Sequence, residues 1–90
     1  MSGAEALDAF LGRLAARDSS ENTRRSYRTA IEQYLGFLDG RKLDWRSPGR
    51  PAVRAYLGEL TDRGLSKRSI SSRLAALRSF YRYARREGLY

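Results

Sequence analysis

The spacing of apolar side chains predicts four helices, the first of which covers residues 4–17. Apolar residues recur there at intervals of three and four, so they share one helical face. They are Leu7, Phe10, Leu11 and Leu14. The polar segment at positions 18–20, Asp-Ser-Ser, is expected to end this helix.

The second predicted helix covers residues 21–38. Ser20 is a suitable N-cap because its hydroxyl can accept a hydrogen bond from a backbone N–H that has no partner within the helix. Glu21 suits the positive end of the helix dipole, and Asp39 and Gly40 form a stop signal. The apolar stripe of this helix is Tyr27, Ile31, Tyr34, Leu35 and Leu38.

Residues 40–51 are expected to form a connector, because glycines and prolines interrupt any helical pattern there. Trp45 lies in this connector among polar residues. It could stack on a nucleic-acid base, but we favour the interpretation that it is a hydrophobic plug covering one edge of the core.

The last two predicted helices cover residues 51–63 and 67–87. Pro51 is acceptable in the first turn of a helix, and Gly64 suits the left-handed conformation that follows a helix end. Ser66 is placed to cap the fourth helix, and Gly88 is expected to end it. The inward-facing residues are Val53, Tyr56, Leu57 and Leu60 in the third helix, and Ile70, Leu74, Leu77, Phe80, Tyr81 and Ala84 in the fourth.

The sequence contains no alternating strand pattern, and its 90 residues are enough for about one small domain. We therefore predict an all-α domain of four helices. Because the connections between them are short, helical hairpins are the natural architecture.

Composition narrows the chemistry that this domain can carry. The chain has no Cys and no His, which excludes a structural disulfide, a Cys/His zinc site and histidine acid–base catalysis. It also has no phosphate-binding GxxxxGK[ST] or GxGxxG loop and no D-x-D-x-D calcium loop. The sequence therefore predicts no metal and no cofactor.

No uncharged run approaches the roughly 20 apolar residues of a membrane span. The N-terminus lacks the basic and apolar regions of a secretory signal. A cytoplasmic location without membrane contact is the expectation.

Positive charge is concentrated toward the C-terminus. The whole chain has 18 Lys and Arg against 10 Asp and Glu, a formal net charge of +8. Residues 66–90 alone contain seven basic side chains and a single acidic one, Glu87, a net charge of +6. Such a patch is typical of a protein that binds a polyanion, although a solvated arginine-rich helix face would have the same composition.

The starts of the second and fourth helices share a composition that favours DNA binding. Residues 20–26 read SENTRRS and residues 66–73 read SKRSISSR, so short hydroxyl or amide side chains alternate with basic ones. Backbone N–H groups and the helix dipole favour phosphate at a helix start, and arginine can reach a phosphate or a guanine edge. For Ser20 and Ser66, ordinary helix capping is the simpler interpretation.

These segments also resemble one protein family. The stretch Ser20-Glu21-Asn22-Thr23, followed by Tyr27-Arg28, is similar to the second helix of tyrosine site-specific recombinases, in particular Xer recombinases and phage integrases. Residues 65–90 resemble the fourth helix of that family and the end of its domain more strongly still. The resemblance extends over residues 7–90.

The resemblance implies the N-terminal core-binding domain of these recombinases. That domain is a SAM-like bundle of four helices arranged as two crossed helical hairpins, and it clamps one face of a recombination half-site. The starts of the second and fourth helices would lie at the major groove of double-stranded DNA. The DNA-binding residues implied are Asn22, Thr23, Arg24, Ser26, Tyr27, Arg28, Ser66, Lys67, Arg68, Ser69, Ser72 and Arg73. Tyr27 also lies on the apolar stripe, so a core position is its alternative.

In such recombinases a separate C-terminal catalytic domain supplies a tyrosine nucleophile together with Arg, Lys and His residues. Because this chain has no His, we expect no catalytic residue in it and interpret residues 1–90 as a single, non-catalytic DNA-binding domain. Its expected partners are duplex DNA and the catalytic domain, within a tetramer on DNA at the nucleoid. The isolated domain is expected to be monomeric.

Two other functions fit the same residues. The first is an independent transcription regulator of helix-turn-helix type, with a turn at residues 63–66 and the fourth helix as reader. The second is a protein-interaction module whose basic face contacts an acidic protein.

Overall fold

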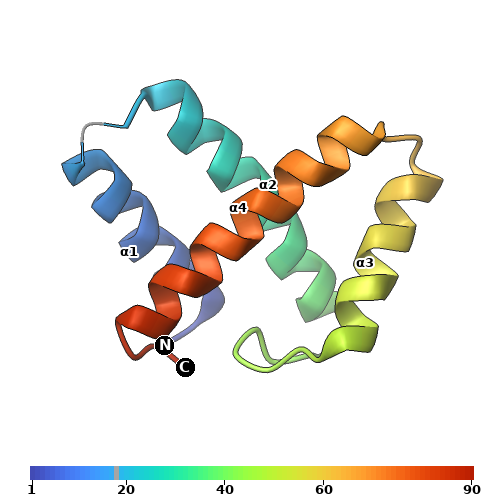
Figure 1. Ribbon diagram of the computed structural model, residues 1–90. Helices are drawn as coiled ribbons and strands as arrows, with labels where there is room; N and C mark the ends of the chain where they lie inside the picture. The colour runs from blue at the N-terminus through green and yellow to red at the C-terminus, as the bar shows by residue number, and fades with distance from the viewer. Residues whose placement is uncertain (18) are drawn as a thin grey trace.

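The computed structural model describes residues 1–17 and 19–90. Asp18, in the segment expected to end the first helix, lies outside these residues. The described residues form four helices and no strand (Figure 1), which confirms the all-α prediction. The helices are α1 (Gly3–Ala16), α2 (Glu21–Gly40), α3 (Arg50–Asp62) and α4 (Lys67–Arg86).

The four helices form two hairpins that cross each other. α1 pairs with α2, α3 pairs with α4, and α4 lies across α2 (Figure 1). The predicted arrangement of a SAM-like bundle is thereby confirmed. Away from the crossing, the N-terminal halves of α2 and α4 diverge, and this divergence positions the candidate site described below.

Serine hydroxyls cap three of the helices. Ser20 accepts a hydrogen bond from the backbone N–H of Thr23 at 3.0 Å, and Ser66 accepts one from Ser69 at 3.2 Å, which confirms both predicted caps. At α1, Ser2 and Glu5 form a reciprocal capping box, and these hydrogen bonds hold the pKa of the Glu5 carboxyl below its usual value. The Ser-x-x-Glu signature of that box was present in the sequence but was not part of the prediction.

The end of α3 agrees with the expectation, whereas the end of α2 differs from it. After α3, Gly64 adopts the predicted left-handed conformation with φ of 83°. After α2, the left-handed residue is Lys42, with φ of 57°, and Gly40 is still helical. The N–H of Leu43 donates to the carbonyl of Leu38 at 2.9 Å, so the chain reverses two residues later than the Asp39-Gly40 signal indicated.

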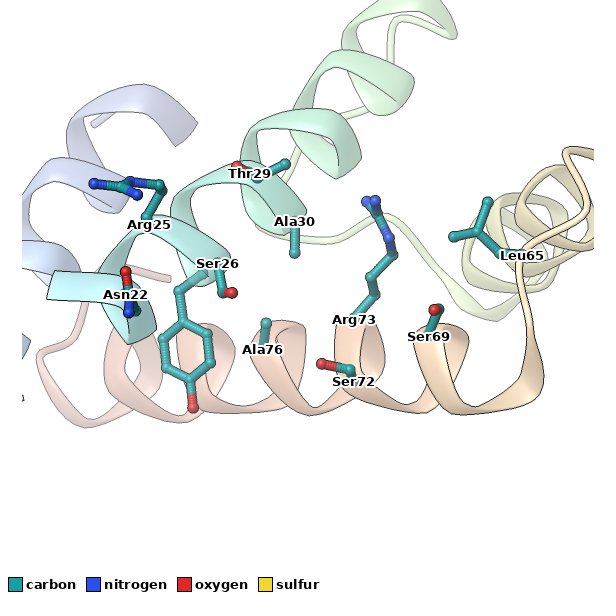
Figure 2. Close-up of a pocket in the computed structure, with 11 residues that line it drawn as sticks. Asn22, Arg25, Ser26, Thr29, Ala30, Leu65, Ser69, Ser72, Arg73 and Ala76 are labelled. Atoms are coloured by element: carbon teal, nitrogen blue, oxygen red, sulfur yellow. The ribbon is translucent and has the colours of Figure 1, made fainter. Parts of the chain in front are cut away.

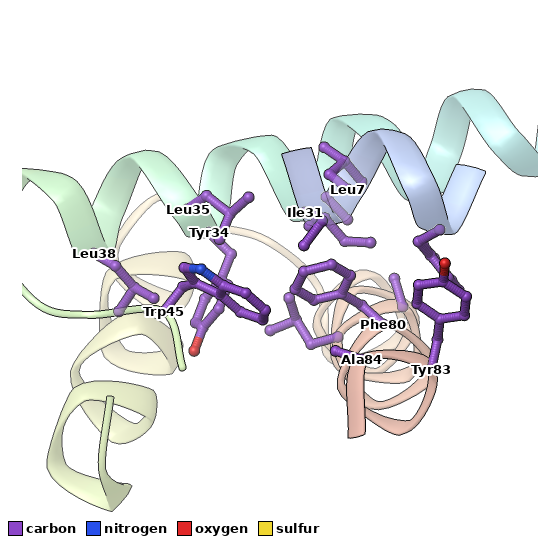
Figure 3. Close-up of a cluster of buried hydrophobic side chains, with 14 of the residues drawn as sticks. Leu7, Ile31, Tyr34, Leu35, Leu38, Trp45, Phe80, Tyr83 and Ala84 are labelled. Atoms are coloured by element: carbon purple, nitrogen blue, oxygen red, sulfur yellow. The ribbon is translucent and has the colours of Figure 1, made fainter. Parts of the chain in front are cut away.

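The core lies where the α1–α2 hairpin meets α4 (Figure 3). The phenyl ring of Phe80 is completely buried, with its centroid 5.8 Å from that of Phe10 and 5.6 Å from that of Trp45. Twelve of the predicted inward-facing residues are buried: Leu7, Phe10, Leu11, Ile31, Tyr34, Leu35, Leu38, Tyr56, Leu60, Leu77, Phe80 and Ala84. Seven others are only partly buried: Leu14, Tyr27, Val53, Leu57, Ile70, Leu74 and Tyr81.

Aromatic side chains dominate the C-terminal side of the crossing, which we call the aromatic end and define by Tyr34, Trp45, Phe80 and Tyr81. The hydroxyls of Tyr34 and Tyr81 lie 2.8 Å apart, and that of Tyr81 donates to the carbonyl of Trp45 at 2.6 Å. The indole N–H of Trp45 donates to the carbonyl of Met1 at 3.2 Å. Burial raises the pKa of both Tyr34 and Tyr81. Trp45 is only 7% exposed, which confirms its interpretation as a plug.

Candidate nucleic-acid interface

A groove of about 580 Å³ opens between the N-terminal halves of α2 and α4 (Figure 2). Its lining residues follow one another at helical spacing, so a single face of each helix forms a wall. We call it the α2–α4 groove. It is lined by Asn22, Arg25, Ser26, Tyr27, Thr29 and Ala30 of α2, by Leu65, and by Ser69, Ser72, Arg73 and Ala76 of α4.

Small side chains leave this groove open. Ser26 and Ala30 on α2 face Ser69, Ser72 and Ala76 on α4, where longer side chains would fill the space between the helices (Figure 2). Hydroxyl groups give the walls donors and acceptors without bulk. The result is a concave surface whose walls carry mostly short side chains.

The charge of the α2–α4 groove is positive. Arg25 and Arg73 belong to its lining, and none of the described residues that line it is acidic. Lys67 and Arg68 are exposed in the first turn of α4, outside the lining. The starts of both helices also present the positive ends of their dipoles on this side of the molecule (Figure 1). The arrangement suits an anionic ligand such as phosphate.

Half of the predicted DNA-binding residues line the α2–α4 groove, and three others are at its α4 side. Those in the lining are Asn22, Ser26, Tyr27, Ser69, Ser72 and Arg73. Ser66, Lys67 and Arg68 are exposed at the start of α4. The hydroxyl of Ser66 is already engaged as the helix cap.

The remaining three predicted residues contact other parts of the protein. Thr23 shares a 2.7 Å hydrogen bond with the Ser20 hydroxyl. The guanidinium of Arg24 donates to the carbonyl and hydroxyl oxygens of Ser19, in the segment that precedes α2. Arg28 forms ion pairs with Glu32, at 3.3 Å, and with Asp8 of α1, at 3.8 Å. Arg24 and Arg28 therefore lie on the side of α2 that faces α1.

Tyr27 both contacts the core and lines the α2–α4 groove. Its ring stacks on that of Phe10, with centroids 5.9 Å apart and planes inclined by 18°. The side chain is nevertheless only partly buried and belongs to the lining of the α2–α4 groove. Tyr27 thus connects the wall of the groove to the core.

Two polar groove residues, Arg25 and Thr29, were absent from the sequence-based set. Both could have been found from helical periodicity, since Arg25 and Thr29 lie three and seven residues after Asn22 and so share its face. The guanidinium of Arg25 is 3.6 Å from the carboxylate of Glu21, in an exposed pair. Such a pair is weak, so it leaves Arg25 available to a ligand.

Arg73 has the most extensive contacts of the groove arginines. Its Nη1 donates to the side-chain carbonyl of Gln33 on α2, which lies beyond the groove lining. Burial raises the pKa of the Tyr56 hydroxyl on α3, and the positive charge of Arg73 opposes that shift. Through Gln33, Arg73 joins α4 to α2.

Among residues 1–17 and 19–90, no group of three or more Asp and Glu side chains is arranged to hold a metal ion. In the same part of the chain, no helix is long and apolar enough to cross a membrane.

Comparison with known proteins identifies the family of this domain. A family model described as "Phage integrase, N-terminal SAM-like domain" matches residues 7–88. The chain belongs to this family. The resemblance to Xer recombinases and phage integrases, drawn from the helix patterns, is confirmed.

Curated relatives of this integrase-type domain are recombinases. It is 38% identical over 92% of its length to "Tyrosine recombinase XerD" of Pseudomonas aeruginosa. It is also 37% and 39% identical to proteins named "Tyrosine recombinase XerC" from Roseiflexus castenholzii and Chlorobaculum parvum, over 94% and 86% of its length. The chain spans only 28%, 28% and 25% of the length of these three relatives. No solved structure gave a significant match.

Proposed function

We propose that residues 1–90 form one DNA-binding module of an Xer-type tyrosine recombinase, and that the α2–α4 groove clamps one face of a recombination half-site. The observation that carries this proposal is the groove itself. The N-terminal halves of two serine-capped helices form the walls of a positively charged concave surface lined by hydroxyl, amide and guanidinium groups. The names of the relatives, all recombinases, support the same function.

The dimensions of the elements are suited to duplex DNA. A helix with its side chains is about 10–12 Å across, and the major groove of B-DNA is about 12 Å wide. Small side chains near the starts of α2 and α4 allow their backbones to approach the phosphates, while Lys67, Arg68 and Arg73 reach phosphate or base edges. Most contacts would be with the backbone, so sequence preference would be modest.

DNA cleavage and rejoining would belong to a C-terminal catalytic domain of the whole recombinase. On its own, the chain would bind DNA as a monomer and would neither cleave nor ligate it. In the complete protein it would act within a tetramer assembled on DNA in the bacterial nucleoid. We assign no catalytic role to the tyrosines of this domain.

A fluorescence-anisotropy titration of labelled duplex DNA across a range of salt concentrations tests the proposal. With roughly four to eight phosphate contacts, the logarithm of the association constant should fall against log salt with a slope of about −4 to −7. Binding without salt dependence, or no binding at low salt, contradicts the proposal.

A matched pair of charge variants locates the binding surface. Ser72→Glu places a carboxylate in the α2–α4 groove, whereas Ser47→Glu places the same charge in the exposed connector between α2 and α3. Ser72→Glu should weaken binding far more than Ser47→Glu, because only its carboxylate would approach the phosphates closely. Equal losses would mean that DNA binds elsewhere.

The two alternative functions predict different results in DNA-binding experiments with the same chain. A helix-turn-helix regulator would use the turn at residues 63–66, where Gly64 has its positive φ, and would protect promoter palindromes from DNase rather than recombination half-sites. A protein-interaction module would show no DNA binding at low salt.

A further inference from the structure

The exposed side of α4 is basic along its whole length. With about 100° of rotation per residue, all exposed residues of this helix except Ser69 and Ser72 fall within one sector of about 100°, which we call the outer face of α4. The outer face consists of Lys67, Arg68, Ser71, Ala75, Arg78, Arg82, Arg85 and Arg86. Six of these eight residues are basic and none is acidic. Since α4 has 20 residues, the basic face is about 30 Å long.

The cations of the outer face lack the acidic partners that arginines have elsewhere in the fold. On α3, for example, Arg63 pairs with Glu59 four residues before it, at 3.1 Å. Among the described residues, no ion pair involves a side chain of the outer face. Arg82 instead has Arg78 four residues before it and Arg86 four residues after it. Like charges at this spacing repel each other, so an anion bound along the face would relieve the repulsion.

A hollow of about 520 Å³ lies at the C-terminal end of the outer face, and we call it the C-terminal hollow. It is lined by Tyr81, Arg82, Arg85, Arg86 and Tyr90. The rings of Tyr81 and Tyr90 contact each other, with centroids 5.7 Å apart, and both lie against Trp45. None of the described residues that line the hollow is acidic, and the nearby Glu87 is engaged with Arg13 at 3.3 Å. A cleft with charges of one sign and walls of low dielectric constant concentrates the field on a counter-ion.

We propose that the outer face of α4 is a second DNA contact, separate from the α2–α4 groove, which binds phosphates of the duplex backbone and has the C-terminal hollow as its anchor. This inference rests on the proposed function. From Arg73 in the groove to Arg86 in the hollow the helix rises about 20 Å, so the two surfaces at opposite ends of α4 (Figure 1) would contact different phosphates. Cations of one sign over the length of a helix fit the regular charge of a DNA backbone better than the mixed charges of a protein surface.

Two matched double variants measure what the second contact contributes. Arg82→Gln with Arg86→Gln removes two charges, four residues apart, from the C-terminal hollow. Arg50→Gln with Arg54→Gln is the control, because it removes two charges at the same spacing from exposed positions on α3. In the titration of labelled duplex DNA, the first should weaken binding by about three- to tenfold at low salt and reduce the magnitude of the salt slope by about 2. The control should bind within about twofold of the unaltered chain.

Arginine side-chain resonances locate the contact without any substitution. When duplex DNA is added to the ¹⁵N-labelled chain, the Nε–Hε resonances of Arg82, Arg85 and Arg86 should move, because their guanidinium groups would bind phosphate directly. The backbone amides of the buried Trp45 and Phe80 should change little. This measurement keeps the test decisive even where the double variant lowers the stability of the fold.

The outcomes separate this inference from the proposed function. If the unaltered chain shows no salt-dependent DNA binding, both proposals fall. If Ser72→Glu weakens binding but the double variant of the hollow binds like the α3 control, only the second contact is wrong. If the double variant of the hollow weakens binding and Ser72→Glu does not, the groove assignment falls and the second contact stands. Arginine resonances that stay in place with duplex DNA would overturn the second contact, and a hollow that binds an acidic protein would give that result.

Discussion

On the C-terminal side of the α2–α4 crossing, aromatic rings fill the space between the helices, whereas on the N-terminal side serine and alanine leave a groove between the same two helices. The aromatic end is closed by ring contacts and by hydrogen bonds that link Tyr34, Tyr81 and Trp45. The α2–α4 groove carries arginines and hydroxyls on an open surface. One helix pair thus stabilises the fold at one end and, in the proposed function, binds DNA at the other, so substitutions at the two ends should have separable effects.

The largest expected effect is at the aromatic end. Phe80→Ala should lower the free energy of unfolding by about 3–5 kcal/mol, because it removes a completely buried ring and leaves a cavity among Phe10, Trp45 and Tyr81. Chemical denaturation monitored by circular dichroism measures the change. Ser72→Ala in the α2–α4 groove is the control on the same helix, with an expected change within about 0.5 kcal/mol. Similar losses for both variants would remove the distinction between the two ends.

High pH should destabilise the fold through the buried tyrosines of the aromatic end. Burial raises the pKa of Tyr34 and Tyr81 above the ordinary value of 10.0, so these tyrosines stay neutral in the folded chain while they ionise in the unfolded chain. Their contribution is fully present below pH 10 and is lost as the pH rises above it, by at most about 1.4 kcal/mol per pH unit for each such tyrosine. Denaturation at several pH values from 8 to 11 measures this slope.

Tyr81→Phe sharpens the same test. The variant should lose about 1 kcal/mol near neutral pH, because the hydrogen bond to the Trp45 carbonyl is gone. Its stability should then fall less steeply above pH 10 than that of the unaltered chain. An unchanged slope would show that Tyr81 does not carry the pH dependence.

Removal of single positive charges in or beside the α2–α4 groove should weaken DNA binding and leave the stability of the fold nearly unchanged. Lys67→Ala and Arg73→Ala should each weaken DNA binding roughly three- to tenfold and reduce the magnitude of the salt slope by about 1. Their melting temperatures should change little, although Arg73→Ala also loses its contact with Gln33. Arg54→Ala on the exposed surface of α3 removes the same charge outside the groove and is the matched control. If Lys67→Ala and Arg73→Ala lower stability strongly and leave affinity unchanged, these residues are structural.

The smallest expected effect on stability is at the turn after α2, outside both the aromatic end and the α2–α4 groove. Lys42 adopts a left-handed conformation that glycine tolerates better, so Lys42→Gly should relieve backbone strain. Glycine also increases the entropy of the unfolded chain, so the net gain in unfolding free energy should be only a few tenths of a kcal/mol. Denaturation midpoints measure it, and a loss above about 1 kcal/mol would contradict this explanation.

The fold could be predicted from the sequence because its elements are specified locally. Apolar spacing located each helix, and Ser20, Ser66 and Gly64 marked helix boundaries through capping and a positive φ. Ala84 was predicted to face inward, but four other buried alanines were missed, because a small apolar side chain is as common on an exposed helix face as at a close helix crossing. These missed core positions, together with one tyrosine, are Ala6, Ala30, Ala52, Ala76 and Tyr83.

The candidate site was only partly predictable for a related reason. A helix start indicates which residues are near a ligand, but which face of the helix is free depends on tertiary packing. Arg24 and Arg28 follow the same composition as Arg25, yet Arg24 bonds to Ser19 before α2 and Arg28 pairs with Asp8 of α1. The hydrogen bond from Arg73 to Gln33 joins α4 to α2 across 40 positions of the chain, so no local pattern could indicate it.

Titration of the ¹⁵N-labelled chain with duplex DNA at low salt tests the central claim most directly, because each backbone amide reports its own surroundings. We predict that the largest shifts fall on residues 21–29 of α2 and 66–76 of α4, while the amides around Trp45 and Phe80 change little. An unchanged spectrum, or shifts confined to α1 and the aromatic end, would contradict the assignment of the α2–α4 groove as the DNA-binding surface.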